Sequence, residues 1–219
     1  MKTISILFTG TGQLVANLEN QLHTYCPECR VLKTVDDSLI KEVIQHNGMT
    51  KSVMRRVLHN MENAQAAGAD LIVCACSSIG DAALCARNYL DVPVIRIDEA
   101  MIRRALQISQ RVGVLASLET TMLPTTSYVR ALAAEEGIVP SIYQVVAEGA
   151  YQAMKQGDHS LHDQLILETA KKMTSNVDVI VLAQGSMARM EAALREETGL
   201  PVLSSPELCA MAVRDLLKQ

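Results

Sequence analysis

The sequence predicts an α/β protein made of two homologous parallel-sheet halves, and three observations predict this class. Short apolar runs of strand length alternate with amphipathic segments of helix length along the chain. The pattern starts again after 108 residues, which indicates an internal duplication. The apolar run Asp70–Ala75 ends abruptly in Cys76-Ser77-Ser78 before helical periodicity begins, as expected at the carboxyl end of a buried parallel strand.

The first half contains strand and helix segments in strict alternation. Its strands are expected at Ile4–Phe8, Arg30–Thr34, Asp70–Ala75 and Pro93–Ile97. Its helices are expected from Gln13 to about His23, from the Asp36-Asp37 turn to about His46, from Thr50 to about Ala67, and from Ile79 onward. A further helix, which ends at Ile108, is expected after the strand Pro93–Ile97 and leads into the second half. The helix from Thr50 carries Val53, Val57 and Met61 at i, i+4 spacing, which predicts one buried face. Units of this kind connect parallel strands by right-handed crossovers.

The second half repeats the first in register. The corresponding pairs are Ile4–Thr9 with Val112–Ser117, Asp70–Val73 with Asp178–Val181, and Val92–Val94 with Leu200–Val202. We therefore expect a first half at residues 1–97, joined by a C-terminal helix at 206–219, and a second half at residues 98–205. Related halves commonly pack about a pseudo-twofold axis, so equivalent loops are expected to line an active site in the cleft between them.

Composition excludes several classes of function. The net charge is −4, so no basic field points to nucleic acid or to an anionic membrane. Aromatic residues make up 3% without Trp, which argues against stacking platforms for bases. No apolar run approaches the roughly 18 residues of a membrane span, and the first strand runs directly into Thr9-Gly-Thr-Gly12, unlike a signal peptide. We expect a cytoplasmic protein with reduced thiols and with no nucleic-acid or membrane partner.

Four of the six cysteines lie away from the central strand ends. Cys85 and Cys209 fall in helical patterns and are expected in the core as small hydrophobic residues. Cys26 and Cys29 have the spacing of a redox pair or of a zinc half-site, or they belong to an ordinary loop between a helix and a strand. No second pair and no suitably spaced histidines complete a zinc site, so no metal is expected.

Cys76 is the candidate catalytic residue. It lies on the same strand face as Cys74, at the strand end where open α/β sheets bind ligands. The start of the following helix supplies N–H donors and a partial positive charge, which are expected to hold a carboxylate and to lower the pKa of the thiol. Ser77 and Ser78 either bind a carboxylate or cap this helix. The offset of 108 places Gln184, and not a thiol, at the equivalent position.

The loops after the equivalent strands supply the candidate binding residues. Gly10 and Gly12 allow either close approach of a ligand or a simple tight turn, and they lack the third glycine of a dinucleotide motif. Thr120 and Thr121 either bind a carboxylate or cap a helix. Arg96 is either a carboxylate clamp or part of a surface ion pair. The expected substrate-binding residues are Thr9, Gly10, Gly12, Gln13, Ser77, Ser78, Ser117, Thr120, Thr121, Gln184, Gly185 and Ser186.

The duplicated halves and these loops resemble the aspartate/glutamate/hydantoin racemase superfamily over nearly the whole chain. Cys76-Ser77-Ser78 resembles its Cys-Asn-Thr-like loop, and Ala183-Gln184-Gly185 stands where the second half has a Gly-Cys-Thr-like loop. The resemblance implies a cofactor-independent enzyme in which one cysteine removes the α-proton and an opposite cysteine returns a proton. Here Gln184 replaces the second cysteine. Phe8-Thr9-Gly10 also replaces the Asp-Ser-Gly signature of glutamate racemases, so a plain glutamate racemase is not expected.

An amide cannot donate a proton as an acid at neutral pH, so the substitution leaves three functions open. The first is a racemase-like isomerase that acts on a small carboxylate, an amino acid or a related acid, through Cys76 and without a cofactor. The second is a one-cysteine decarboxylase or lyase on a substituted malonate or similar diacid, as in the malonate decarboxylases of the same superfamily. The third is a non-catalytic protein that binds a small acid. Proteins of this superfamily are often dimers, so the resemblance also implies a homodimer.

Overall fold

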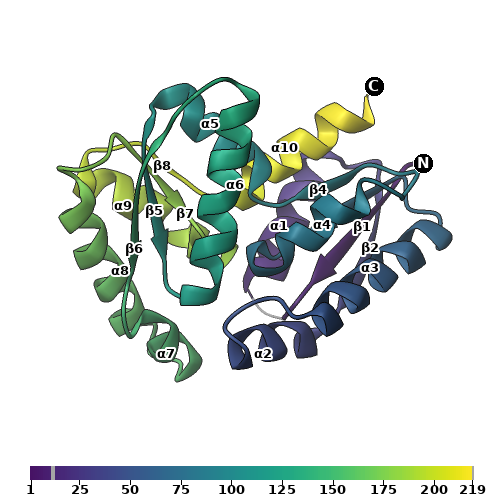
Figure 1. The fold of residues 1–219 in the computed structure, drawn as a ribbon, viewed down its shortest axis with the longest axis horizontal. Coiled ribbons are helices and arrows are strands. Elements are labelled where there is room, and N and C mark those ends of the chain that lie inside the picture. The colour runs from purple at the N-terminus through teal and green to yellow at the C-terminus, as the bar shows by residue number, and fades with distance from the viewer. Residues whose placement is uncertain (11–12, 219) are drawn as a thin grey trace. The chain divides into compact units, whose positions relative to one another are not determined.

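The computed structural model describes residues 1–10 and 13–218, which fold into two compact units (Figure 1). Unit 1 comprises Met1–Ala100 and Pro206–Gln219, and unit 2 comprises Met101–Ser205. Each unit contains one four-stranded parallel sheet flanked by helices, so the expected α/β class is confirmed. Gly12 and the side chain of Gln13, both expected at the site, lie outside the described part of the chain.

The sheet of unit 1 has the strand order β2-β1-β3-β4. Its strands are β1 (Thr3–Phe8), β2 (Arg30–Val35), β3 (Leu71–Cys74) and β4 (Val94–Arg96). Its helices are α1 (Gln13–Tyr25), α2 (Asp37–Gln45), α3 (Lys51–Ala66), α4 (Gly80–Ala86) and the C-terminal α10 (Ser205–Leu217), with a 3₁₀ turn η1 (Ser77–Ile79). Thr50 caps α3, because its hydroxyl accepts a hydrogen bond from the Val53 N–H at 3.1 Å.

Side chains on the two faces of this sheet enter two separate cores. Ile4, Ile6 and Phe8 of β1 pack with residues of α1 and α10 on one face. Leu7 of β1 packs on the other face, against residues of α2, α3 and α4. The predicted buried stripe of α3 is confirmed, since Val53, Val57 and Met61 are fully buried there. Strands covered on both faces need the near-continuous apolar sequence that β1 and β3 have.

The sheet of unit 2 has the corresponding order β6-β5-β7-β8. Its strands are β5 (Arg111–Ala116), β6 (Ser141–Val146), β7 (Val179–Leu182) and β8 (Val202–Leu203). The helices are α5 (Glu99–Ile108), which begins just before the division between the units, α6 (Met122–Glu135), α7 (Ala150–Lys155), α8 (His159–Met173) and α9 (Glu191–Thr198). Two 3₁₀ segments, η2 (Glu119–Thr121) and η3 (Gly185–Met190), follow β5 and β7.

The internal repeat is visible in the strand positions and in their register. Strands β5, β7 and β8 begin at residues 111, 179 and 202, each 108 residues after β1, β3 and β4, which begin at 3, 71 and 94. Leu7 pairs with Cys74 between β1 and β3, and Leu115 pairs with Leu182 between β5 and β7. The offset found in the sequence is therefore the offset of the fold. The pseudo-twofold axis and the cleft between the halves stay predictions.

The two helical cysteines differ in their surroundings. Cys209 is buried in the core between α1 and α10, as predicted. The prediction for Cys85 is wrong, because this residue is exposed on the outer side of α4. An amphipathic helix buries only a stripe, and the small Cys side chain does not reveal on which side of the stripe boundary it lies. Within the described residues, no helix has the length and apolarity that a membrane crossing requires.

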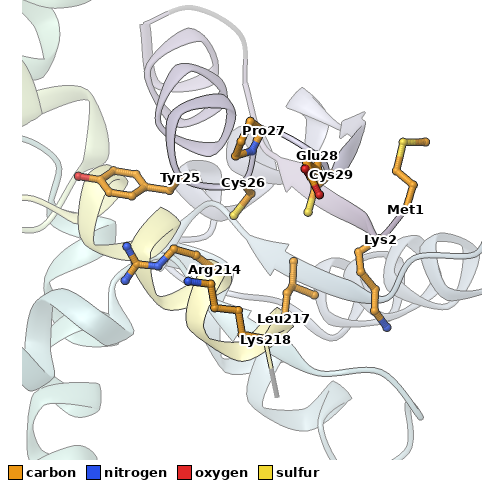
Figure 2. Close-up of a pocket in the computed structure, with 10 residues that line it drawn as sticks. All are labelled: Met1, Lys2, Tyr25, Cys26, Pro27, Glu28, Cys29, Arg214, Leu217 and Lys218. Carbon is orange, nitrogen blue, oxygen red and sulfur yellow. The ribbon is translucent and has the colours of Figure 1, made fainter.

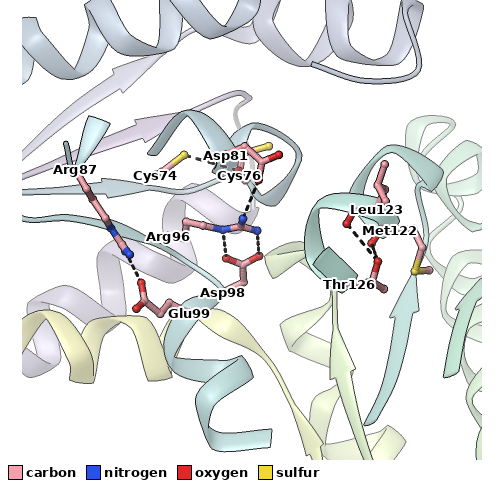
Figure 3. Close-up of polar contacts among 10 residues, drawn as sticks. All are labelled: Cys74, Cys76, Asp81, Arg87, Arg96, Asp98, Glu99, Met122, Leu123 and Thr126. Carbon is pink, nitrogen blue, oxygen red and sulfur yellow. Dashed lines mark hydrogen bonds and ion pairs between the residues drawn. The ribbon is translucent and has the colours of Figure 1, made fainter. Parts of the chain in front are cut away.

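β4 ends in a buried ion pair (Figure 3). Arg96 Nε and Nη2 donate to the two carboxylate oxygens of Asp98 at 2.9 and 2.8 Å, and both side chains are only 1% exposed. The guanidinium lies against the start of α4, where a Cβ on Gly80 would come within 2.4 Å of Arg96 Cζ. The surface ion pair expected for Arg96 is therefore wrong. The bidentate partner also takes the place of the substrate carboxylate that a clamp would hold.

We predict that Asp98→Ala destabilises the protein by about 3–5 kcal/mol, because it removes the buried bidentate carboxylate from a buried guanidinium. The matched control is Asp81→Ala. Asp81 contacts Arg96 Nη1 at 3.4 Å, but its side chain is 56% exposed, so its loss should cost less than about 1 kcal/mol. Urea unfolding curves of the two variants measure the difference. Equal midpoints for the two variants would contradict the buried-pair assignment.

Candidate active site

Cys76 lies on the connection between β3 and α4. The chain stays extended through Cys76, with φ −148° and ψ 117°, and then turns into η1 and α4. Cys76 is half-buried, whereas Ser77 and Ser78 are buried. Cys74, two residues earlier, is completely buried and donates its thiol to the Cys76 carbonyl at 3.8 Å (Figure 3). Burial raises the pKa of Cys74 to about 12. Because Cys74 is completely buried and Cys76 is only half-buried, Cys76 is the thiol of this pair that a solute can reach.

Hydrogen-bond donors surround the Cys76 sulfur, yet burial has the larger effect on its pKa. Burial raises the pKa above the ordinary thiol value, while the Thr9 and Ser78 hydroxyls and the N–H groups of Ser78 and Ile79 lower it. The expectation that the helix start would lower the pKa is therefore wrong in its net direction. The donors are present, but desolvation of the thiolate outweighs them. At neutral pH the group is chiefly a protonated thiol.

The two serines after Cys76 do not cap the following helix. Neither η1 nor α4 has a side-chain hydrogen bond at its N-cap position, so the capping alternative for Ser77 and Ser78 is wrong. The Ser78 hydroxyl is buried and has no hydrogen-bond partner of regular geometry within the described residues. An unsatisfied buried hydroxyl costs free energy, which a bound polar group next to Cys76 would recover.

The loop after β1 lies beside the Cys76 loop because β1 and β3 are neighbours in the sheet. Thr9 is buried, and its hydroxyl interacts with the Cys76 thiol. Gly10 is half-buried, and a Cβ built on it would meet no atom of the described residues within 4 Å. Within this part of the chain, neither a positive φ nor crowding requires glycine at position 10. We call Thr9, Cys76, Ser77 and Ser78 the Cys76 cluster.

Gln184 occupies the matching position in unit 2, where it is held by a complete set of hydrogen bonds. Its Oε1 accepts from the Ser117 N–H at 2.8 Å and from the Ser117 hydroxyl at 3.3 Å. Its Nε2 donates to the Thr121 hydroxyl and to the Leu118 carbonyl, the latter at 3.4 Å. The loop after β5 and the loop after β7 are thus joined by one amide. We call Ser117, Thr121 and Gln184 the Gln184 cluster.

The other predicted residues of unit 2 lie close to this cluster in the chain. Thr121 donates its hydroxyl to the Leu118 carbonyl at 2.7 Å, and α6 has no side-chain cap, so the capping alternative for Thr120 and Thr121 is wrong. The Thr120 hydroxyl is buried without a partner among the described residues. Gly185 and Ser186 form the half-buried start of η3, directly after Gln184. The structure therefore groups the predicted residues within each unit, while their binding role stays a prediction.

Sequence reasoning missed two contributors to the Cys76 site. The backbone N–H of Ile79 interacts with the thiol, and the buried Asp98 fixes the arginine against which the start of α4 packs. No signal in the sequence marks this pair, because β4 ends at Arg96 and the chain turns at residues 97–98. No group of three or more His, Cys, Asp or Glu side chains able to hold a metal ion occurs in the described part of the chain.

Comparison with known proteins places the chain in a family. The family model described as Asp/Glu/Hydantoin racemase matches residues 6–213. The chain belongs to the Asp/Glu/hydantoin racemase family. The resemblance inferred from the strand-end loops is thereby confirmed at the level of the family. None of the curated proteins compared with the sequence matches it.

Solved structures of racemases share the fold of this racemase-family chain at low sequence identity. Allantoin racemase from Klebsiella pneumoniae superposes with a TM-score of 0.73 at 19% identity, and the match covers 100% of this chain and 88% of the allantoin racemase chain. Glutamate racemase RacE1 from Bacillus anthracis gives 0.76 at 17% identity, with 99% and 82% covered. Picrophilus torridus aspartate racemase gives 0.72 at 15% identity, with 100% and 95% covered. The similarity establishes the two-domain racemase fold.

We predict that Thr9→Val makes Cys76 less reactive, because the lost hydroxyl no longer stabilises the thiolate and the thiol pKa rises further. Alkylation by iodoacetamide at about pH 8 should slow by about threefold to tenfold, the effect of one typical hydrogen bond. Peptide mass spectrometry measures the rate at Cys76, with the exposed Cys85 as a reference in the same sample. The matched control Thr9→Ser keeps the hydroxyl and should react like the wild type. Equal rates in the Val and Ser variants would contradict the assigned interaction.

Proposed function

We propose that this protein is a racemase-like isomerase that acts on a small carboxylate by cysteine-mediated proton transfer at the α-carbon, without a cofactor. Family membership and the racemase fold support an enzyme of the isomerase class. The observation that carries the proposal is the Cys76 cluster. It holds a half-buried thiol among hydroxyl and backbone N–H donors at the carboxyl edge of a parallel sheet.

Each part of the cluster has a role in such a reaction. The Cys76 thiolate removes the α-proton, and the electron pair passes to the substrate carboxylate as an enediolate. The buried Ser78 hydroxyl, which has no hydrogen-bond partner of regular geometry among the described residues, and the nearby N–H groups donate hydrogen bonds to the substrate oxygens. Burial makes the thiolate scarce at neutral pH but strengthens it as a base, which favours removal of a weakly acidic proton.

The Gln184 cluster limits what happens on the return step. An amide has no titratable proton near neutral pH, and all four of its hydrogen bonds are made inside unit 2. A second thiol is therefore missing at the position equivalent to Cys76. The proton returns from the Cys76 thiol or from solvent, and the products of these two routes differ in configuration.

Exchange of the substrate α-proton tests this proposal. In deuterated water we expect α-deuteration of at least one substrate in a panel of aspartate, glutamate, other amino acids, allantoin and small hydroxy acids. Cys76→Ala should slow the exchange by about 10²–10⁴-fold, the usual contribution of a general acid–base group. Proton NMR follows the loss of the α-proton signal, and chiral chromatography determines the configuration.

Cys85→Ala is the matched control, since it removes an exposed thiol from the helix that follows Cys76. It should leave the exchange rate unchanged. Absence of exchange for every substrate would count against an isomerase. If no substrate is turned over and a small acid binds tightly to both the wild type and Cys76→Ala, the protein is a non-catalytic binding protein instead.

The raised pKa of Cys76 and the amide of Gln184 support a second candidate function. A thiol whose pKa is raised by burial holds its proton at neutral pH. An amide at the equivalent position of unit 2 suits a reaction that needs one proton transfer only. In decarboxylation of a substituted malonate, the carbon–carbon bond breaks, carbon dioxide leaves, and the enediolate takes one proton from the thiol. Solvent then restores the thiol.

Release of carbon dioxide from alkyl- and arylmalonates tests the decarboxylase. If this function is correct, Cys76→Ala should lower the release rate by about 10²-fold or more, since the proton donor is lost. Cys76→Ser offers a hydroxyl of similar size and a much weaker acid, so it should be nearly as slow. A coupled bicarbonate assay measures the rate. Malonate turnover without α-proton exchange of amino acids would favour this function over the isomerase.

A further inference from the structure

A second pair of thiols lies at the opposite edge of the unit 1 sheet from Cys76. Cys26 and Cys29 belong to the connection from the end of α1 to the start of β2. Arg30, the next residue, donates its N–H to the carbonyl of Lys2 at the start of β1. Since parallel strands all start at one edge, this connection is remote from the loops that follow β1 and β3. The proposed function makes no use of it.

The backbone brings the two cysteines close together. The Cys29 N–H donates to the Cys26 carbonyl at 3.0 Å, which closes a turn with Pro27 and Glu28 in the central positions. A turn of this kind keeps its end Cα atoms within about 7 Å. Disulfides join Cα atoms that are about 4.4–6.8 Å apart. The thiols also interact, because Cys29 contributes to the raised pKa of Cys26.

A pocket of about 440 Å³ opens beside this pair (Figure 2). In Figure 2 both sulfur atoms point toward the side of the pocket formed by α10. Cys26 is buried and Cys29 is half-buried, and both are free thiols. The pair does not suit zinc, because no group of three potential ligands occurs in the described residues. A pair of adjacent free thiols with an accessible pocket suits two-electron redox chemistry instead.

We propose that Cys26 and Cys29 form a reversible dithiol–disulfide couple that is oxidised by a small anionic disulfide bound in this pocket. The Cys29 thiolate attacks one sulfur of the small disulfide and displaces one thiol, leaving a mixed disulfide on Cys29. The Cys26 thiolate then attacks the Cys29 sulfur and releases the second thiol. The protein loses two protons and two electrons, and the small disulfide becomes two thiols.

The order of attack follows from the difference between the two thiols. Burial raises the pKa of Cys26 from its ordinary value of 9.0 to about 11, and Cys29 adds to the rise. Below pH 9, a thiol with a pKa of about 11 has about 100-fold less thiolate than a thiol with a pKa of 9.0. The thiolate of the weaker acid is the stronger nucleophile, but this offsets only about tenfold of the loss in rate. Cys26 is also the less exposed of the two. Cys29 is thus the attacking residue, and Cys26 is the resolving residue.

The basic side chains of the lining suit an anionic oxidant. Lys2, Arg214 and Lys218 are the basic side chains of the lining, and Glu28 is the acidic one. Lys2 pairs with Asp70 at 3.0 Å, and Arg214 pairs with Asp215 at 2.7 Å. Lys218 is exposed and acts on Asp215 electrostatically, so among the three it is the side chain most available to a bound carboxylate.

Reaction of the full-length reduced protein with glutathione disulfide tests the couple. In the wild type we expect loss of two hydrogens in a peptide linking Cys26 to Cys29, reversed by excess reduced glutathione. Cys85 in the same sample should carry only a mixed disulfide, because it has no neighbouring thiol of this kind. If Cys85 is modified while no linkage between residues 26 and 29 forms, the proposal is overturned. This readout needs no variant.

Two variants test the order of attack. In Cys26→Ser the glutathione adduct on Cys29 should accumulate, whereas in Cys29→Ser the adduct on Cys26 should form about tenfold or more slowly. The reverse order would overturn the assigned roles. Circular dichroism checks that both variants are folded, and Ala replaces Ser where one is not.

Lys218→Gln tests the anionic character of the oxidant. It should slow oxidation by glutathione disulfide by about twofold to fivefold, but not oxidation by cystamine, which is cationic. Equal slowing of both reactions would overturn the anionic assignment.

Discussion

Both candidate site clusters depend on the parallel pairing of the first and third strands within each unit. Leu7 faces Cys74 in one sheet and Leu115 faces Leu182 in the other, so the loop after each strand emerges beside the loop of its neighbour. This register brings Thr9 to Cys76 and Ser117 to Gln184. A slip of one residue would turn every buried side chain of the strand to the wrong face, so the core that fixes the register also fixes the site.

The two clusters show how one backbone frame supports different chemistry. In unit 1 the strand end carries a thiol, and the surrounding donors oppose the desolvation that raises its pKa. In unit 2 the same strand end carries an amide whose donors and acceptors are satisfied by the neighbouring loop. An amide of this kind stiffens the loops that it joins and supplies no proton. The two halves therefore share a backbone frame, while only one of them carries a thiol at this strand end.

The comparison with racemases of solved structure fits this view. A common fold persists at 15–19% identity, because a parallel sheet with helices on both faces needs only a suitable apolar pattern and suitable turns. Side chains at the strand ends can differ without disturbing the core. Gln184, at the position equivalent to Cys76, is such a difference between the two halves.

The α/β class, the offset of 108, the buried stripe of α3 and the strand-end loops at Cys76 and Gln184 could all be predicted from the sequence. These features depend on local periodicity and on spacing along the chain, which a single sequence records directly. The direction of the Cys76 pKa shift, the hydrogen bonds of Gln184, the burial of Arg96 with Asp98 and the exposure of Cys85 could not be predicted and are seen in the folded chain. Each of these depends on which distant residues surround a side chain. Desolvation and hydrogen bonding act through space, so chain order does not encode them until the sheet is assembled.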